Sequence, residues 1–317
     1  MTRQAFLSYT LLASLSALTL TGCGGDSSSS NDGGEIPDTN DFTLNFKATA
    51  GQMEVDCNNM IGGFGTEEMD SIGLRDLRFY VSNIKFYDDT GAELDVEFDS
   101  NDFQYDSEQG FVALIDLTSN DSGTCDAGEN EGTARTNSVI TGSVEEGSIA
   151  DVSFDIGLPQ AIMKNVINNN TAEDAPTPLN EMYWSWASGY RHFVFNFQVM
   201  NTVGTYGEGY LHIGSRGCGG DGLLALEEKE QCDFINTPSV MLENFNPYVN
   251  TIVVDIAQAL NDVDFVVDVQ DSDETAPGVS CHSGPMQSDC AAIFSNFGVS
   301  MESGAAEAES NNVFGME

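Results

Sequence analysis

Residues 193–199 read FVFNFQV, with an apolar side chain at every second position. Side chains of a β-strand alternate between two faces, so this period of two is typical of a strand with one face in a core. Six further segments repeat the pattern, at residues 42–46, 77–81, 111–117, 152–156, 252–256 and 263–269. Clusters of Gly, Asn, Asp and Ser lie between the segments and predict turns. The chain is therefore expected to be mainly β, with antiparallel strands.

One of these segments carries a sign of irregularity. Between Leu77 and Phe86 the apolar positions switch from odd to even numbers after Val81. An extra residue in one strand of a pair has this effect, so the switch predicts a β-bulge near Ser82 and Asn83.

The rest of the pattern bounds the architecture. Helix signals are confined to the segment after Pro159 and to residues 223–230 and 291–297, and no internal repeat is visible. We expect a single domain over residues 41–300, an antiparallel sandwich or barrel-like fold with a few short helices and three disulfides. Residues 301–317 are acidic and rich in small side chains, so an acidic tail that frays is expected.

The charge balance excludes whole classes of partner. The 317 residues include 51 Asp and Glu against 10 Lys and Arg, which gives a formal charge of −41. A chain without a basic surface cannot release counterions from phosphates, so a nucleic-acid partner is excluded, and charge-driven binding to anionic lipids is disfavoured. The apolar content of 40% is enough for a packed core. So large an imbalance points to a salt-rich medium or bound cations as compensation.

The N-terminus predicts export. Arg3 precedes an apolar run at residues 6–20, which is placed as in a secretory signal peptide, assigned here to residues 1–22. The approach to Cys23 resembles the lipobox of bacterial lipoproteins, in which this thiol is acylated; an ordinary signal peptide with a chance cysteine is the alternative. Residues 23–40 are rich in Gly, Ser and Asp, as a flexible lipidated tether would be. We expect a membrane-anchored lipoprotein at the outer membrane or the periplasmic face.

Six cysteines remain in the exported chain, and an even number points to disulfides. They are Cys57, Cys125, Cys218, Cys232, Cys281 and Cys290. Six cysteines allow 15 pairings, which spacing alone does not resolve. We expect pairing in chain order, because the last two pairs then close short loops rich in Gly and Asp. No C-x-x-C spacing occurs, which leaves covalent haem attachment, thioredoxin-like chemistry and a Cys-rich zinc site without support.

The scarcest candidate metal ligand is histidine. The chain contains His192, His212 and His282. Imidazole suits copper, although a lone histidine is more often a surface or hydrogen-bonding residue. His192 and His212 alternate with apolar neighbours, and His282 directly follows Cys281.

Other chemistries have weaker support. No G-x-S-x-G motif appears, and acidic residues are too numerous to single out a catalytic pair, so an enzyme is not expected. Calcium is the rival cofactor, since acidic clusters supply hard oxygen ligands without an EF-hand spacing. These acids are Asp88, Asp89, Asp271, Asp273 and Glu274. The alternative function is thus a calcium-stabilised adhesion or glycan-binding surface module.

Both tryptophans lie in one short motif. Residues 182–190 read MYWSWASGY and contain Trp184 and Trp186. Residues two apart share a face of a strand, so both indoles and His192 would lie on one side if the strand continued through Gly189. From the pattern alone, the simplest interpretation is an aromatic cluster that covers the core.

Taken together, these motifs resemble the MbnP family, exported copper-binding proteins that are encoded beside the dihaem, peroxidase-like MbnH. The resemblance runs from about residue 42 to residue 299, and W-x-W-x-x-G-Y at residues 184–190 is a characteristic element. The other matching stretches are residues 76–84, 89–91, 114–117, 140–142, 154–159, 179–180, 211–214 and 281–285, with Cys125, Cys218 and Cys290.

The resemblance implies a copper site built partly from a tryptophan that the dihaem partner oxidises to kynurenine. Indole offers no lone pair to a metal, whereas kynurenine carries an aryl amine and a ketone. On this basis Trp184 or Trp186 is the modified residue, and His212 is the ligand within a matching motif. His282 occupies a position that is often Met in the family, and His192 matches no invariant family residue. The chain would be the substrate of its partner rather than a catalyst.

Overall fold

The computed structural model describes residues 40–120, 123–125, 135–144, 147–171, 174–185, 189–219, 231–268 and 275–317. All of them belong to one compact unit, Pro37–Glu317. The expected signal peptide, Cys23, nearly all of the tether and the helix signal at residues 223–230 lie outside the described residues. None of the helices in the described part of the chain is long and apolar enough to span a membrane.

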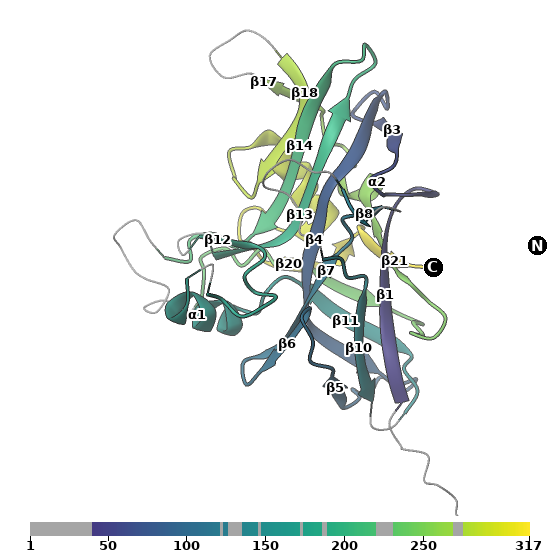
Figure 1. Cartoon of the computed structure of the whole chain (residues 1–317), viewed down its shortest axis with the longest axis vertical. Coiled ribbons are helices and arrows are strands. Elements are labelled where there is room, and N and C mark those ends of the chain that lie inside the picture. The colour runs from purple at the N-terminus through teal and green to yellow at the C-terminus, as the bar shows by residue number, and fades with distance from the viewer. Residues whose placement is uncertain are drawn as a thin grey trace, which may run out of the picture. The chain divides into compact units, whose positions relative to one another are not determined.

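Two sheets form most of this unit (Figure 1). The larger comprises β3 (Met60–Phe64), β4 (Asp70–Tyr87), β6 (Gln104–Ser107), β7 (Gly110–Asp116), β11 (Asp151–Ile156), β12 (Tyr183–Ser185), β13 (Gly189–Met200), β14 (Tyr206–Gly214), β15 (Ser239–Leu242), β17 (Val266–Asp268) and β18 (Thr275–His282). The smaller comprises β1 (Asn40–Ala50), β2 (Met53–Glu54), β5 (Val96–Phe98), β10 (Val139–Val144), β16 (Ile252–Asp255) and β21 (Phe314–Met316).

The strand order sets the neighbours of each element. The larger sheet runs β15-β11-β4-β13-β14-β18-β17, with β3, β6, β7 and β12 paired at its sides. The smaller runs β21-β16-β1-β10-β5, and β2 pairs with β1. Most neighbours are antiparallel, as expected, but β1 with β16 and β14 with β18 are parallel pairs.

Short helices and strand pairs complete the described chain. They are α1 (Gln160–Asn169), α2 (Ile256–Ala259), α3 (Ser288–Asn296), and the pairs β8 (Ser119–Asn120) with β9 (Gly123–Thr124) and β19 (Phe297–Val299) with β20 (Ala306–Asn311). The first and last helices lie where the sequence predicted them. In contrast, α2 replaces the end of an expected strand, because the carboxylate of Asp255 accepts hydrogen bonds from the N–H groups of Ala257 and Gln258 and so caps a helix.

The two sheets pack face to face through aromatic side chains. Phe46 of β1 makes edge contacts with Phe79 of β4 and Phe154 of β11, with ring centroids 5.9 and 6.3 Å apart. Phe79 also stacks on Phe193 of β13 at 5.6 Å. The prediction of a mainly β fold is confirmed: the sheets are arranged like a sandwich, and the described strands do not close into a barrel.

The opposite face of the larger sheet has its own, smaller core. Tyr80 of β4 and Val194 of β13 are buried there with Met163 of α1. His212 of β14 pairs in register with Val194, while its neighbour Leu211 belongs to the core between the two sheets. Alternation along β14 therefore places His212 on the face that carries the smaller core.

The bulge expected in β4 is present. The pairing of β4 with β11 shifts in register between Ser153 and Asp155, and Asn83 has a φ of 51°. Asn adopts this left-handed region more readily than most residues. The amide of Asn83 donates to the carboxylate of Asp155 at 2.7 Å, which fixes the irregular turn of the strand.

The C-terminal residues do not form the expected fraying tail. They form β20 and β21, and β21 pairs with β16 of the smaller sheet. Phe314 is 7% exposed and contacts the rings of Phe79, Phe154, Phe193 and Phe297. The prediction was wrong because one aromatic side chain at the end of the acidic stretch completes the core and holds the segment down.

Truncation of Phe314 to Ala should lower the free energy of unfolding by about 3 kcal/mol, the usual cost of removing a buried phenylalanine ring. Urea denaturation followed by fluorescence measures the change. Met316→Ala is the matched control, because this side chain of the same strand is 38% exposed. The control should change stability by less than about 0.5 kcal/mol. Equal stabilities for Phe314→Ala and the unaltered protein would contradict the packing of β21.

The expected disulfide pairing is confirmed. The bonds join Cys57 to Cys125, Cys218 to Cys232 and Cys281 to Cys290. The third bond links the end of β18 to α3, one residue before His282. It therefore anchors the end of the strand that carries this histidine.

Candidate metal centre

Two histidines that are 70 residues apart in the chain meet on neighbouring strands. The parallel register of β14 and β18 places His212 opposite His282. The two Nδ1 atoms are 2.8 Å apart, and the ring centroids are 4.6 Å apart. Two nitrogen ligands about 2.0 Å from one ion and about 90° apart would be separated by about 2.8 Å, so the spacing fits a shared metal ion.

Both imidazoles of this histidine pair are neutral at neutral pH. Burial, with smaller contributions from His282, Arg191 and Arg78, lowers the pKa of His212 to about 2. Burial and the nearby Arg191 also lower the pKa of His282. Neutral imidazole is the form that binds a metal. Neither ring therefore has to be deprotonated from the imidazolium form before it can act as a ligand.

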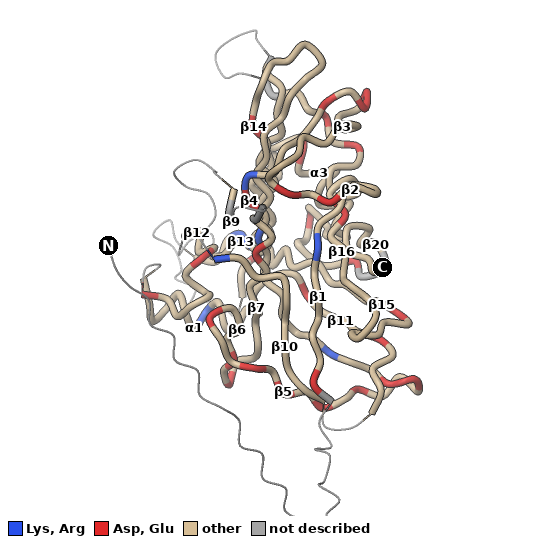
Figure 2. The backbone as a smooth tube through the Cα atoms, turned by 45° about the vertical axis from the view of Figure 1, so that its right-hand side comes forward, with Lys and Arg blue, Asp and Glu red and all other residues tan. Residues whose placement is uncertain are grey.

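A buried cation lies on the same face of the sheet as His212, two strands away. Acidic residues are spread along the described chain, whereas Lys and Arg are few (Figure 2). One of these few, Arg78 of β4, has a side chain only 5% exposed and donates two hydrogen bonds of 2.7 Å to the carboxylate of Asp76. Val194 pairs with Arg78 on one side and with His212 on the other. The guanidinium thus lies two strands away on the same face and disfavours protonation of His212.

Side chains next to the histidine pair connect its two strands. The hydroxyl of Ser283 donates to the backbone oxygen of His212 at 2.9 Å and accepts from the N–H of Gly214 at 2.8 Å. The side-chain oxygen of Gln287 accepts from the backbone N–H of His282 at 2.8 Å. These bonds fix the backbone on both sides of the pair, as a preorganised binding site requires.

Sequence reasoning missed the residues that support the pair. Asn196 was visible as a polar residue of FVFNFQV on the side away from the phenylalanines, and its Oδ1 lies 2.7 Å from Nε2 of His212. Ser283 and Gln287 carried no comparable signal, since their roles depend on the pairing of β14 with β18.

Trp184 lies beside the pair. Its ring meets that of His212 edge to face, with centroids 6.5 Å apart and an interplanar angle of 89°. It also covers Gly214, where an added Cβ would be 3.3 Å from the indole. The structure therefore brings one of the two candidate tryptophans to the histidines, whereas Trp186 lies outside the described residues.

The strand that carries Trp184 does not continue through Gly189, so the condition for both indoles and His192 to share one side is not met. Instead β12 turns back as a hairpin, in which Tyr183 pairs with Tyr190 and Ser185 with Gly189. Gly189 has a φ of 77°, and a Cβ there would lie 2.5 Å from the hydroxyl oxygen of Ser215. A glycine is therefore needed at this position, where a new strand begins.

His192 is placed differently from the other two histidines. Its side chain is completely buried, its Nδ1 accepts from the N–H of Leu158 at 3.3 Å, and its Nε2 lies 3.0 Å from the backbone oxygen of Ile235. Burial lowers its pKa to about 4. Both ring nitrogens are engaged with the backbone, so His192 joins loops to the sheet and presents no free lone pair to a metal.

Calcium ligands are not assembled in the part of the chain that is described. No group of three His, Cys, Asp or Glu side chains that could hold a metal occurs among these residues. The carboxylate of Asp88 accepts from the N–H groups of Thr90 and Ala92, so it serves the turn. Three of the other acids proposed as calcium ligands lie outside the described residues: Asp271, Asp273 and Glu274.

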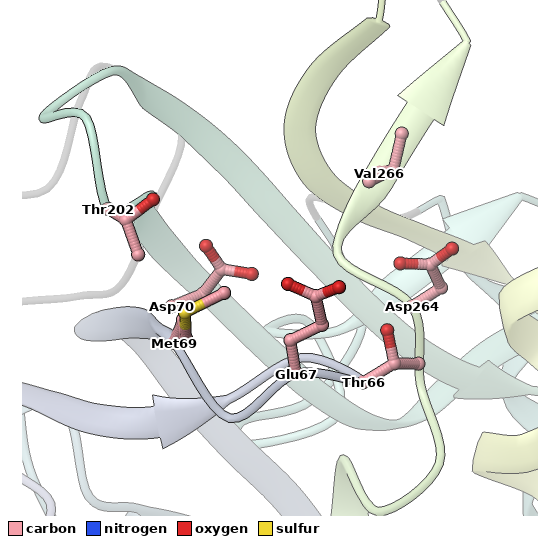
Figure 3. Close-up of a pocket in the computed structure, with 7 residues that line it drawn as sticks. All are labelled: Thr66, Glu67, Met69, Asp70, Thr202, Asp264 and Val266. Carbon is pink, nitrogen blue, oxygen red and sulfur yellow. The ribbon is translucent and has the colours of Figure 1, made fainter.

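An acidic cavity of about 310 Å³ lies apart from the histidine pair (Figure 3). Its lining consists of Thr66, Glu67, Met69, Asp70, Thr202, Asp264 and Val266. Burial raises the pKa of Asp70, and repulsion from Asp264 and Glu67 raises it further. The neighbouring carboxylates thus disfavour the ionised form of Asp70, and the three acidic side chains are the main polar feature of the cavity.

Acidification from pH 6.5 to pH 4 should remove the stability that buried His192 contributes. The pKa of an exposed histidine is 6.5, and that of buried His192 is about 4, so the unfolded chain binds more protons and stability falls as pH decreases through this window. Asp116 acts in the opposite direction over the same range: its pKa rises from 3.8 to about 7 on burial, so its stabilisation is largest at acidic pH and is lost as pH rises towards 7.

Melting temperatures from pH 4 to pH 8 separate the two groups. His192→Gln should reduce the loss of stability on acidification by about 3 kcal/mol, the contribution expected of this residue. Asp116→Asn should make the protein relatively more stable above pH 7. Identical pH profiles for both variants and the unaltered chain would contradict these assignments.

The comparisons with known proteins agree with the fold described above. The family model for MbnP matches residues 39–283. Among solved structures, MbnP from Methylosinus trichosporium matches with a TM-score of 0.66 and 20% identity, over 88% of this chain and 98% of that chain. At this identity the likeness shows the fold alone. No curated protein matches the chain. Because the family model covers well over half of the sequence, the chain belongs to the MbnP family.

Proposed function

We propose that this chain is an exported copper-binding protein in which His212, His282 and a kynurenine formed from Trp184 bind one copper ion. The observation that carries the proposal is the meeting of these three side chains, with Nδ1 atoms 2.8 Å apart and the indole edge-on to His212. Neutral imidazoles suit copper, which also stands highest in the affinity order of divalent metals.

Trp184 has to change chemically before it can contribute a ligand. The indole N–H is only a hydrogen-bond donor. Conversion to kynurenine removes one ring carbon and adds one oxygen overall, a gain of about 4 Da, and it exposes an aryl amine and a ketone. This would add a donor to the two that the histidines supply. A dihaem partner of the MbnH kind would catalyse the oxidation with a peroxide as the oxidant, and the lost ring carbon would leave as formate; the chain would be its substrate rather than an enzyme.

The proposed location rests on the sequence of residues 1–40. Cleavage before Cys23 and acylation of its thiol would hold the protein at the outer membrane or the periplasmic face, since an acyl chain supplies apolar area that inserts into the bilayer. The Gly- and Ser-rich residues that follow would act as a flexible tether. The folded unit could then reach a partner in the same compartment.

Protein isolated from its native host, in which the partner is made, tests the proposal. We expect an intact mass about 4 Da above that of the unmodified lipoprotein, near-ultraviolet absorbance from kynurenine and one bound copper per chain. Recombinant protein made without the partner should keep both indoles and bind copper more weakly. Two unaltered tryptophans together with no copper uptake in the native material would reject the proposal.

The calcium-stabilised adhesion or glycan-binding module predicts a different response in the same samples. Removal of calcium by a chelator would lower the melting temperature, and added copper would change nothing. The strongly acidic composition is the feature that supports this alternative.

A further inference from the structure

Asn196 contacts the histidine pair from the side opposite the turn at residues 283–287. It lies on β13 next to β14, its side chain is 5% exposed, and its Oδ1 is 2.7 Å from Nε2 of His212. A side-chain amide oxygen only accepts hydrogen bonds. Nε2 of His212 must therefore carry a proton and donate it to this oxygen.

That proton determines the state of the remaining nitrogens. A neutral imidazole has one N–H group, so Nδ1 of His212 bears a lone pair, and this lone pair faces Nδ1 of His282 at 2.8 Å. A hydrogen bond of this length needs a donor, so His282 carries its proton on Nδ1. His192 has its own fixed state, with Nδ1 accepting from Leu158 and Nε2 donating to Ile235.

We propose that Asn196 is a positioning residue of the histidine pair. Asn196 keeps the lone pair of His212 on Nδ1, and in the metal-free protein this lone pair holds His282 in its Nδ1–H form. The inference rests on the proposed copper function. A metal ion arriving between the rings meets a free lone pair on His212. The Nδ1 proton of His282, which is partly exposed, moves through solvent to Nε2 of the same ring, so no net proton is released.

The first test uses metal-free protein labelled with nitrogen-15. Long-range proton–nitrogen correlation spectra show directly which nitrogen of each ring is protonated. We expect Nε2–H for His192 and His212 and Nδ1–H for His282. Nδ1–H on His212 would overturn the proposal. Because this measurement involves no metal, the expected pattern together with a failure to bind copper would reject the proposed function and leave the role of Asn196 in setting the tautomer intact.

The second test compares two variants at one position. Asn196→Leu removes the acceptor, so His212 should populate both tautomers, and the affinity for cuprous ion, measured by competition with a chromogenic chelator, should fall about 10- to 100-fold. Asn196→Asp keeps an oxygen acceptor and should restore both the Nε2–H form and most of the affinity. An unchanged tautomer and affinity in Asn196→Leu would overturn the proposal. If that variant does not fold, the spectrum of the unaltered protein and the response of Asn196→Asp decide the question.

Discussion

Replacement of Trp184 by Phe should abolish the gain of about 4 Da in protein made together with the dihaem partner. Phenylalanine has no pyrrole ring to open, and Trp184 is the tryptophan that meets His212 edge to face. The variant should also bind copper no better than protein made without the partner, because the ligand that ring opening supplies is missing. Intact-mass spectrometry and a copper titration on the same sample measure both effects.

Trp186→Phe is the matched control for this experiment. It changes the other indole of the same motif, so it should keep both the added mass and the copper affinity of the unaltered protein. The reverse outcome, with modification lost in Trp186→Phe and retained in Trp184→Phe, would show that the assignment of the modified residue is wrong.

Replacement of His212 by Ala should weaken copper binding at least about 1000-fold, or about 4 kcal/mol. The change removes one of two imidazole ligands, and loss of a mere supporting partner already costs about 10- to 100-fold in metal affinity. Isothermal titration of protein made with the partner measures the loss. His282→Ala should have a comparable effect, since its Nδ1 lies 2.8 Å from that of His212.

His192→Gln distinguishes a ligand from a structural histidine. Both nitrogens of His192 are engaged with the backbone of Leu158 and Ile235. The variant should therefore melt at a lower temperature and bind copper as the unaltered protein does. A large loss of copper affinity in His192→Gln with little loss in His212→Ala would contradict the site described here.

Local patterns predicted a large part of the fold. The period of two identified the strands, and the parity switch after Val81 located the bulge at Asn83. Both are properties of a few consecutive residues. The same reasoning failed for the acidic C-terminus, where composition predicted a fraying tail. Phe314 is buried there because it packs against Phe79 and Phe154, which lie on strands far away in the sequence.

The sequence by itself determined that the chain is mainly β, that six cysteines form disulfides and that three histidines are candidate metal ligands, whereas the structure settled which cysteines pair. Only the tertiary structure separated His192, which bonds to the backbone, from His212 and His282, which face one another. It also placed Trp184 beside His212, because β12 pairs as a hairpin with β13, the strand that begins at Gly189. The physical reason is that alternation is fixed within one strand, whereas the neighbour of each strand depends on how both cores pack along the entire chain.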